Sequence, residues 1–160
     1  MLGIALLSAA PFLLSLNLTV AARRRCAALE TYAAFFERLA DVCAGACLPT
    51  PVLLRLAAEG ARVAQFSSFF RDACTGDLPD AWHRLAASQP LLTARERDVL
   101  GSFAGALSET DEMRFAAACR DRRQFFSLQA ETAYKVCRER ERLRLAIGAA
   151  ASVLPAVLLL

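Results

Sequence analysis

The sequence is poor in the residue patterns that carry most enzyme chemistry. It has a single histidine, His83, and its seven glycines are scattered along the chain. No glycine-rich phosphate loop is present, so the chain is not itself a nucleotide-driven motor. No paired carboxylates and no nucleophile with a neighbouring base can be placed. We therefore predict no catalytic residue, no cofactor site and no small-molecule substrate.

Zinc-binding spacings are also missing. The intervals between the six cysteines match no common zinc pattern, and the cysteines stand at positions 26, 43, 47, 74, 119 and 137. Cys43 and Cys47 are four residues apart and share one helix face, which leaves a thiol redox pair as one interpretation. The favoured interpretation is that most cysteines are small buried apolar residues in a reducing compartment. No metal site is predicted.

Charge is absent from both ends of the chain. Residues 1–22 and 145–160 contain no Asp, Glu, Lys or Arg, although 22% of the whole chain is charged and 56% is apolar. Between these ends, basic and acidic residues are interspersed and the net charge is only +3, which argues against a nucleic-acid partner. The pattern predicts an N-terminal transmembrane anchor at 1–22, a helical domain at 23–144 and a short C-terminal membrane segment at 145–160.

The arginines beside the apolar segments predict the orientation of the chain. A cleaved signal peptide carries its positive charge before the apolar run, whereas Arg23-Arg24-Arg25 follows it. An uncleaved anchor is therefore favoured, and a secreted helical protein is the alternative. By the positive-inside rule, this triplet and the basic stretch 138–144 place the domain in the cytoplasm. The C-terminal segment contains Pro155 and either crosses a thin bilayer or enters one leaflet.

The middle domain is predicted to be all-α, a bundle of about six helices, because no stretch alternates apolar and polar residues over strand length. Helices are expected at about 23–46, 51–60, 61–74, 80–88, 93–107 and 110–144. Thr50-Pro51 is a good N-cap and first-turn pair, and Thr93 with Glu96 has capping-box spacing. Nothing stops the last helix before the C-terminal segment.

Apolar residues recur at helical spacing on the first and last of these helices. On the first, the predicted core face is Leu29, Ala33, Phe36, Ala40, Cys43 and Cys47. On the last, it is Phe115, Cys119, Phe126, Ala130, Ala133 and Cys137.

Large aromatic residues are also predicted to contribute to the core. Trp82 is predicted to be buried, with a role as a partner anchor as the alternative, and His83 beside it is predicted to point outward. Phenylalanines occur in adjacent pairs at 35–36, 69–70 and 125–126. Neighbouring helical residues point about 100° apart, so one member of each pair is expected in the core and the other at an edge or a docking surface.

The charged face of the last helix admits two interpretations. For residues 120–135 a solvated face with ion pairs is favoured. For residues 138–144, contact with acidic lipid and a solvated face are both open.

The most specific stretch of the sequence is Leu100-Gly-Ser-Phe-Ala-Gly-Ala-Leu107-Ser-Glu-Thr-Asp111. It resembles the Phe-Gly-x-x-Leu-Gly-x-x-Asp junction before the last helix of the stage III sporulation protein AB family of endospore-forming bacteria. Leu48-Pro-Thr-Pro51 resembles that family's Thr-Pro-Leu element, and Ala81-Trp82 its Ala-Trp pair. The resemblance covers nearly the whole chain, from the anchor to the leucine-rich tail.

The resemblance implies a non-enzymatic scaffold in the complex between mother cell and forespore. The chain would lie in the mother-cell membrane around the forespore, with its bundle facing the cytoplasm. The soluble part of the family is similar to the cytoplasmic domain of type II secretion inner-membrane platform proteins. The implied partners are therefore a secretion-type ATPase-like protein, other membrane proteins of the complex and membrane lipid, with self-association left open.

The sequence departs from the family's junction at two glycines, which are Ala104 and Ser108 here. A glutamine usual early in the last helix is also replaced near Phe115. If the family's glycines let partner backbones approach closely, these departures predict a changed partner surface.

Overall fold

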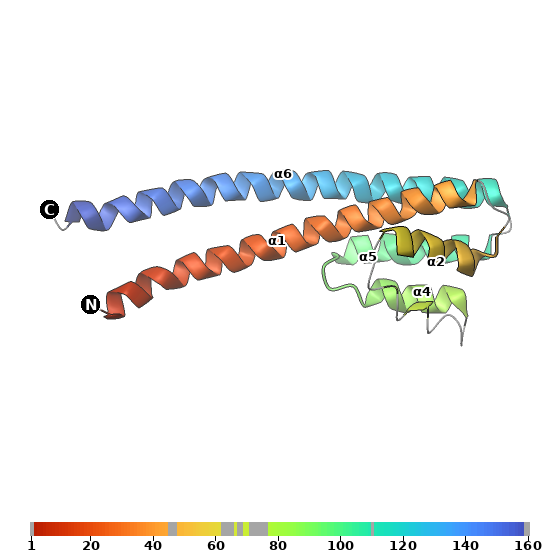
Figure 1. Ribbon diagram of the computed structural model, residues 1–160, viewed down its shortest axis with the longest axis horizontal. Coiled ribbons are helices and arrows are strands. Elements are labelled where there is room, and N and C mark those ends of the chain that lie inside the picture. Colours follow the sequence, from red (N-terminus) through yellow and green to blue (C-terminus); the bar gives the residue numbers. More distant parts are fainter. Residues whose placement is uncertain are drawn as a thin grey trace. The chain divides into compact units, whose positions relative to one another are not determined.

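The computed structural model describes the backbone of residues 2–44, 48–61, 66, 69–70, 77–109 and 111–158, and the side chains of those among them that lie between 20 and 143. Every regular element in this part is helical, which confirms the all-α prediction for it (Figure 1). The chain forms two compact units. Unit 1 comprises residues 1–26 and 131–160, and unit 2 comprises residues 27–130. The predicted limits at 22/23 and 144/145 concern the membrane and stay predictions.

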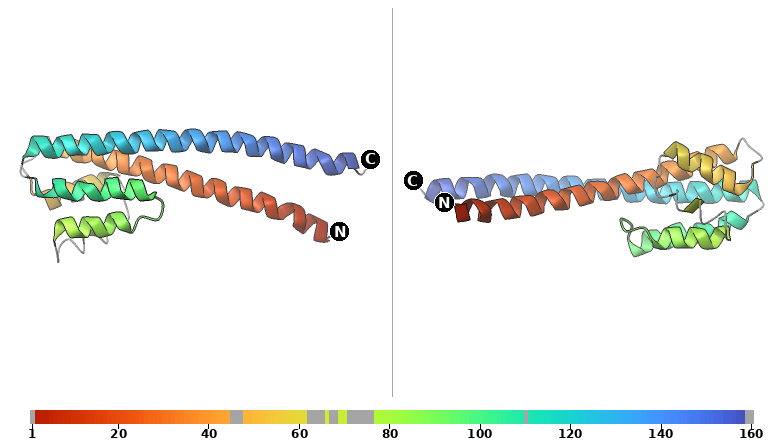
Figure 2. Two further views of the ribbon diagram at one scale, coloured as in Figure 1. Left: turned by 180° about the vertical axis from the view of Figure 1, so that it is seen from behind. Right: turned by 60° about the horizontal axis from the view of Figure 1, so that its bottom comes forward.

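Two long helices contribute to both units. Helix α1 spans Leu2–Cys43 and helix α6 spans Glu112–Leu158, each as one unbroken ribbon (Figure 2). The prediction that nothing interrupts the last helix before residue 145 is confirmed. The first helix ends earlier than the predicted residue 46, with a last turn in which the Ala44 amide donates to the Ala40 carbonyl at 3.2 Å.

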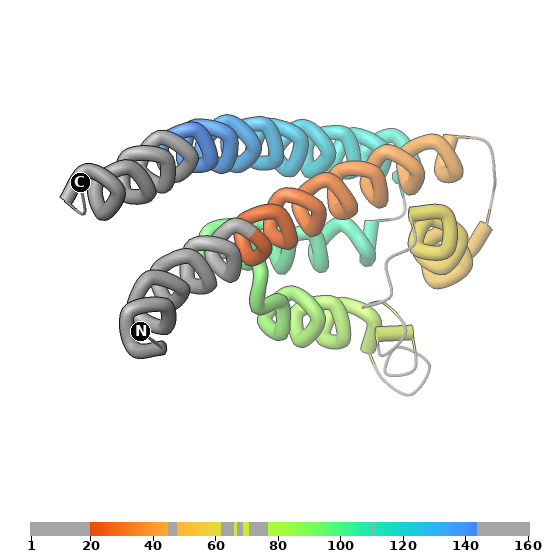
Figure 3. The backbone as a smooth tube through the Cα atoms, turned by 60° about the vertical axis from the view of Figure 1, so that its left-hand side comes forward, coloured from red at the N-terminus to blue at the C-terminus, as the bar shows by residue number. Residues whose placement is uncertain are grey.

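Unit 2 adds shorter helices to parts of α1 and α6 (Figure 3). They are α2 (Thr50–Ala61), α4 (Leu78–Ala87), α5 (Ala94–Gly101) and the 3₁₀ helix η1 (Ser102–Ser108). Of the predicted helix 61–74, the structure describes residue 61, which ends α2, and Phe66, Phe69 and Phe70, which are helical; the others lie outside the described residues.

The ends of two of the shorter helices also differ from the prediction. Helix α4 begins at Leu78 rather than at residue 80, because Pro79 fits the first helical turn, where its missing N–H costs nothing. The helix predicted to end near residue 107 ends as an α-helix at Gly101 and continues as the tighter η1. Such 3₁₀ segments are common at the ends of α-helices.

The predicted helix starts depend on local hydrogen bonds. The capping box is confirmed: the Glu96 amide donates to Thr93 Oγ1 at 3.3 Å, and the Thr93 amide donates to Glu96 Oε2 at 2.6 Å. Ahead of α6, the Met113 amide donates to Asp111 Oδ1 at 2.9 Å. Helix α2 begins at Thr50, one residue earlier than a Thr50 N-cap implies, since the Leu53 amide donates to the Pro49 carbonyl.

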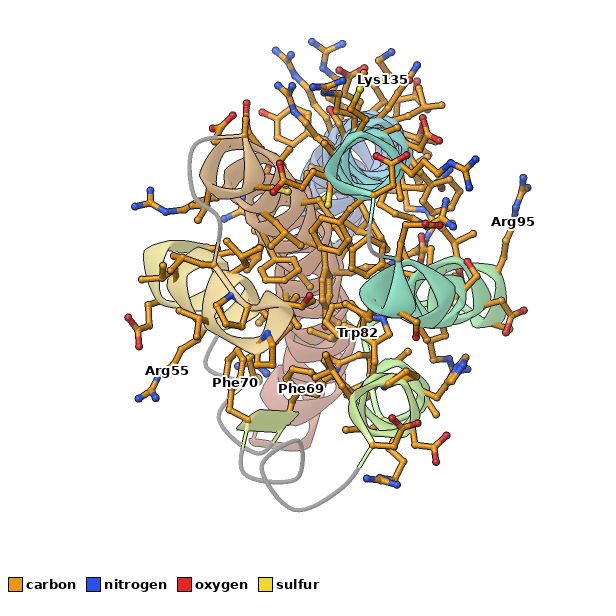
Figure 4. All side chains as sticks on the ribbon, turned by 90° about the vertical axis from the view of Figure 1, so that its right-hand side faces the viewer. Arg55, Phe69, Phe70, Trp82, Arg95 and Lys135 are labelled. Atoms are coloured by element: carbon orange, nitrogen blue, oxygen red, sulfur yellow. The ribbon has the colours of Figure 1, made fainter. Side chains whose placement is uncertain are left out.

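An aromatic cluster around Trp82 forms the core of unit 2 (Figure 4). The Trp82 ring lies 5.4 to 6.4 Å, between centroids, from five phenylalanine rings of other elements: Phe35, Phe36, Phe66, Phe69 and Phe103. Its Nε1 donates to the Leu100 carbonyl at 2.7 Å, so the one polar atom of the indole is satisfied inside the core. Trp82 is fully buried, which confirms its predicted core position.

The predicted core face of α6 is confirmed, since it is buried throughout except for half-buried Ala133. The face predicted for α1 was too narrow. Tyr32, Phe35 and Leu39 are also buried, while Ala33 and Ala40 are only half-buried. Their positions extend the buried arc around one flank of α1, where Phe66 and Trp82 pack on it.

Candidate functional site

The cysteines with described side chains are Cys26, Cys43, Cys119 and Cys137, and all four are buried thiols rather than disulfides. Burial raises the pKa of the Cys43 thiol, and nearby Glu112 raises it further. Burial, with a smaller contribution from Cys43, raises the pKa of Cys119 to about 12. Both thiols are therefore protonated at neutral pH and are weak nucleophiles.

The proposed redox partner Cys47 and also Cys74 lie outside the described residues. Within the described part of the chain, no cluster of three or more His, Cys, Asp or Glu side chains is arranged to hold a metal ion.

The two candidate residues of α4 have different environments. Trp82 has no accessible surface, so it is not available as an anchor for a partner. His83 is exposed, as predicted, and its ring lies beside Gly101, where a Cβ would be 3.3 Å from Nδ1.

The phenylalanine pairs divide as predicted in two of three cases. Phe69 and Phe126 are buried, and their neighbours Phe70 and Phe125 are half-buried. Phe35 and Phe36 are both fully buried, so the prediction was wrong there, because α1 is packed on two flanks. Each phenylalanine with a described side chain is buried or half-buried, so these residues form no exposed docking row.

Ala104 and Ser108, the two positions of the junction before α6 that differ from the sporulation family it resembles, have different environments. Ala104 is 2% exposed and packs in the core, whereas Ser108 is exposed. A Cβ at the intervening Gly105 would meet nothing within 4 Å, so this side of η1 is open. Of these two positions, only Ser108 is accessible at the surface.

Charge is distributed unequally between the two units. Unit 1 contains eight basic and three acidic residues, and unit 2 contains eleven basic and thirteen acidic residues. The corresponding net charges are +5 and −2. The basic residues of unit 1 all stand within a few turns of the charge-free segments, so the cationic part of the molecule directly borders them.

An ion pair joins the two helices of unit 1. The Arg23 guanidinium donates to Glu141 Oε1 through Nη2 at 2.8 Å and through Nε at 3.0 Å. This hydrogen bond, and the charge of Glu141, raise the pKa of Arg23. Buried Cys26 and Cys137 stand about one turn away on α1 and α6. The ends of the charged region, 118 residues apart in sequence, therefore lie side by side.

Other basic residues of unit 1 lie beside this ion pair without forming one. Arg24 of α1 is exposed, as are Lys135, Arg138 and Arg142 of α6. The last three are spaced i, i+3, i+7 and therefore share one helix face. Lys135 points away from α6 in Figure 4. Among the described side chains, Arg23 is the residue that neutralises Glu141, which leaves these four cations to the solvent.

Helix α2 carries a small apolar surface. Leu48, Val52 and Leu56 are spaced by four residues and are 41%, 42% and 41% exposed. Leu56 lies beside the buried face of α2, about 60° around the helix from Leu53, and not within that face. Arg55 and Glu59 flank this surface and pair with each other at 3.2 Å.

No helix within the described part of the chain combines the length and the apolar character needed to span a bilayer. The side chains of the two predicted membrane segments, 1–22 and 145–160, lie outside that part except for residues 20–22. No protein-family model, curated protein or solved structure matches the chain.

Proposed function

We propose that this chain is a non-enzymatic, membrane-attached adaptor whose helical bundle lies in the cytoplasm and positions a partner protein. The observation that carries the proposal is the Arg23–Glu141 ion pair. It brings together the two points at which the charge-free ends join the charged domain. Two apolar segments that enter a bilayer from one side need such an arrangement, with cations on the cytoplasmic side of both.

The packing of unit 2 supports a structural role. Its interior is filled by phenylalanine and tryptophan rings, and the buried side chains Trp82, Gln89 and Glu96 direct their polar atoms to backbone groups of the same unit. Their polar atoms therefore stabilise the fold. A densely packed aromatic bundle keeps its shape when a partner pulls or pushes on it, which suits an adaptor.

We propose further that the adaptor works in the sporulation complex between mother cell and forespore. This part of the proposal comes from the resemblance of residues 48–51, 81–82 and 100–111 to the stage III sporulation protein AB family. The bundle would then dock a secretion-type ATPase-like protein at the mother-cell membrane around the forespore. Other membrane proteins of the complex, or a second copy of the chain, are further partners on this view.

Topology is the direct test of membrane attachment. Arg95 is exposed on α5 and points into solvent, so an R95C chain adds an accessible thiol, whereas the native cysteines with described side chains are buried (Figure 4). In intact cells a membrane-impermeant maleimide should leave R95C unlabelled, and it should label R95C after permeabilisation. The parent chain is the control for background labelling. Labelling of R95C in intact cells, or a mature chain that lacks residues 1–22, would refute the proposal.

The sporulation part is tested separately. Deleting the gene in its own host should block heat-resistant spore formation, and the full chain should restore it. A host that forms no endospores, or a deletion strain with normal spore yield, would contradict this part and leave membrane attachment unaffected.

A further inference from the structure

Several exposed arginines of unit 1, including Arg23 and Arg140, stand near the charge-free segments. Three others of this group are Arg24, Arg138 and Arg142, and we call these three the arginine collar. Arg24 adjoins Arg23 in sequence and Arg142 adjoins Glu141, so the ion pair of Arg23 and Glu141 places both at the same level of the helix pair. Within the described side chains, none of the three forms an ion pair.

Helix geometry sets the distance of each cation from the apolar segment. With a rise of about 1.5 Å per residue, Arg142 stands about 4.5 Å and Arg138 about 10 Å from residue 145 along the axis. Lys135, on the same face, stands about 15 Å away. The headgroup layer of one leaflet is about 5–7 Å thick, and charges are screened over about 8 Å at physiological ionic strength. Arg142 therefore stands within the headgroup layer, Arg138 stands within one screening length of it, and Lys135 stands at the limit of that length.

We propose that the arginine collar binds the phosphate groups of anionic lipid headgroups. The inference rests on the proposed membrane attachment and names the lipid class that this attachment selects. Guanidinium groups suit this role, because each presents a planar fork of N–H donors that matches a phosphate bidentately. Their long side chains keep the stem along the helix and carry the charge to the interface.

The nearby acidic residues do not neutralise the positive charge of the arginine collar. Glu141 is engaged by Arg23 at 2.8 Å. Glu139 is three residues before Arg142 and is its neighbour on the helix surface, so it offsets part of the charge of Arg142. Glu131 shares the face of Lys135 but lies one turn further from the apolar segment. The two arginines of this face, with Arg24, still exceed the single charge of Glu139. The positive field is therefore strongest at the end that borders residue 145, where an anionic headgroup would be met first.

The test uses the full chain reconstituted into bilayers of phosphatidylcholine or of an equimolar mixture with phosphatidylglycerol. Electron spin resonance of spin-labelled lipids gives the association constant of phosphatidylglycerol relative to phosphatidylcholine. The wild-type chain should prefer phosphatidylglycerol, with up to about fivefold contributed by each arginine, and the preference should decline as salt is added. The R24Q/R138Q/R142Q chain should show a clearly lower ratio than the wild-type chain, with any remaining preference due to cations that it keeps, such as Arg140.

Two controls separate the collar from charge in general. The R84Q/R95Q/R120Q chain loses the same charge from exposed residues of unit 2 and should keep the wild-type preference. The K135Q chain loses a cation from the same face as Arg138 and Arg142, and it should lose less preference than R142Q. Circular dichroism of each variant should show unchanged helix content, because the substituted side chains are exposed.

The outcomes also distinguish this inference from the proposed function. A wild-type chain that stays in vesicles after an alkaline wash but contacts both lipids equally would overturn the collar and leave membrane attachment intact. Equal loss of preference in the collar and unit 2 variants would overturn it as well. The collar proposal is also overturned if the R24Q/R138Q/R142Q chain keeps its lipid preference but loses binding to an acidic partner protein. A chain recovered in no vesicle fraction would refute the proposed function itself.

Discussion

Replacing Trp82 by Phe and by Ala separates the two ways in which this side chain stabilises unit 2. The indole contacts five phenylalanine rings and donates a hydrogen bond to the Leu100 carbonyl at 2.7 Å. W82F keeps an aromatic ring but removes the donor. W82A removes both the donor and the ring, and leaves a cavity at the centre of the cluster.

The expected losses follow from complete burial of both residues. In W82F the Leu100 carbonyl loses its side-chain donor in a site without solvent, which costs about 1–3 kcal/mol of unfolding free energy. In W82A the lost ring packing and the cavity raise the cost to about 3–5 kcal/mol. Domains of this size are stable by about 5–15 kcal/mol, so W82A removes a large part of the total.

The measurement is denaturant unfolding of the full chain in detergent micelles, followed by far-ultraviolet circular dichroism. Y134F is the matched control, because Tyr134 is 57% exposed and its substitution should change stability by less than about 0.5 kcal/mol. Trp82 is the single tryptophan, so its native emission should be blue-shifted relative to the unfolded chain.

Either of two results would refute the reasoning about Trp82. If W82F is as stable as wild type, the hydrogen bond to Leu100 does not stabilise the fold. If W82A costs less than about 1.5 kcal/mol, or native emission equals that of the unfolded chain, the ring is not at the centre of the core.

Two further predictions use the same unfolding measurement. T93A should lose about 1 kcal/mol because the Glu96 amide loses its acceptor, while T93S should keep most of it; equal losses would contradict the capping box. Burial raises the pKa of Cys119 from 9.0 to about 12, so the unfolded chain releases the thiol proton first as pH rises. Stability should therefore be unaffected below pH 9 and should fall above it by up to about 1.4 kcal/mol per pH unit. The C119A chain should show a shallower fall, and an unchanged slope would count against this assignment.

Features that depend on neighbours in sequence were predictable. The Thr93–Glu96 capping box needs residues three apart and nothing else, and the structure contains both of its hydrogen bonds. The core stripe of α6 depends only on helical periodicity, and buried Phe115, Cys119 and Phe126 lie on it. The continuation of α6 past residue 144 was equally predictable, because the sequence contains no Gly or Pro that would end the helix before that position.

Features that depend on which elements meet were not predictable. The second buried flank of α1, with Tyr32, Phe35 and Leu39, exists because Phe66 and Trp82 pack there. The change from α5 to η1 places Phe103 against the rings of Phe36 and Trp82, a contact that no local pattern reveals.

The sequence by itself determined that the described part of the chain is helical, that charge stops at Arg23 and Arg144, and that α5 begins after Thr93, since periodicity, hydropathy and capping are local properties. Only the tertiary structure decided that Arg23 binds Glu141, that Arg24 and Arg142 therefore lie at one level, and that Ala104 is buried while Ser108 is exposed. The physical reason is that an ion pair between residues 118 apart, or a side chain's burial, depends on which helices pack together. Which helices pack together depends jointly on all the residues of the core and on no single local pattern.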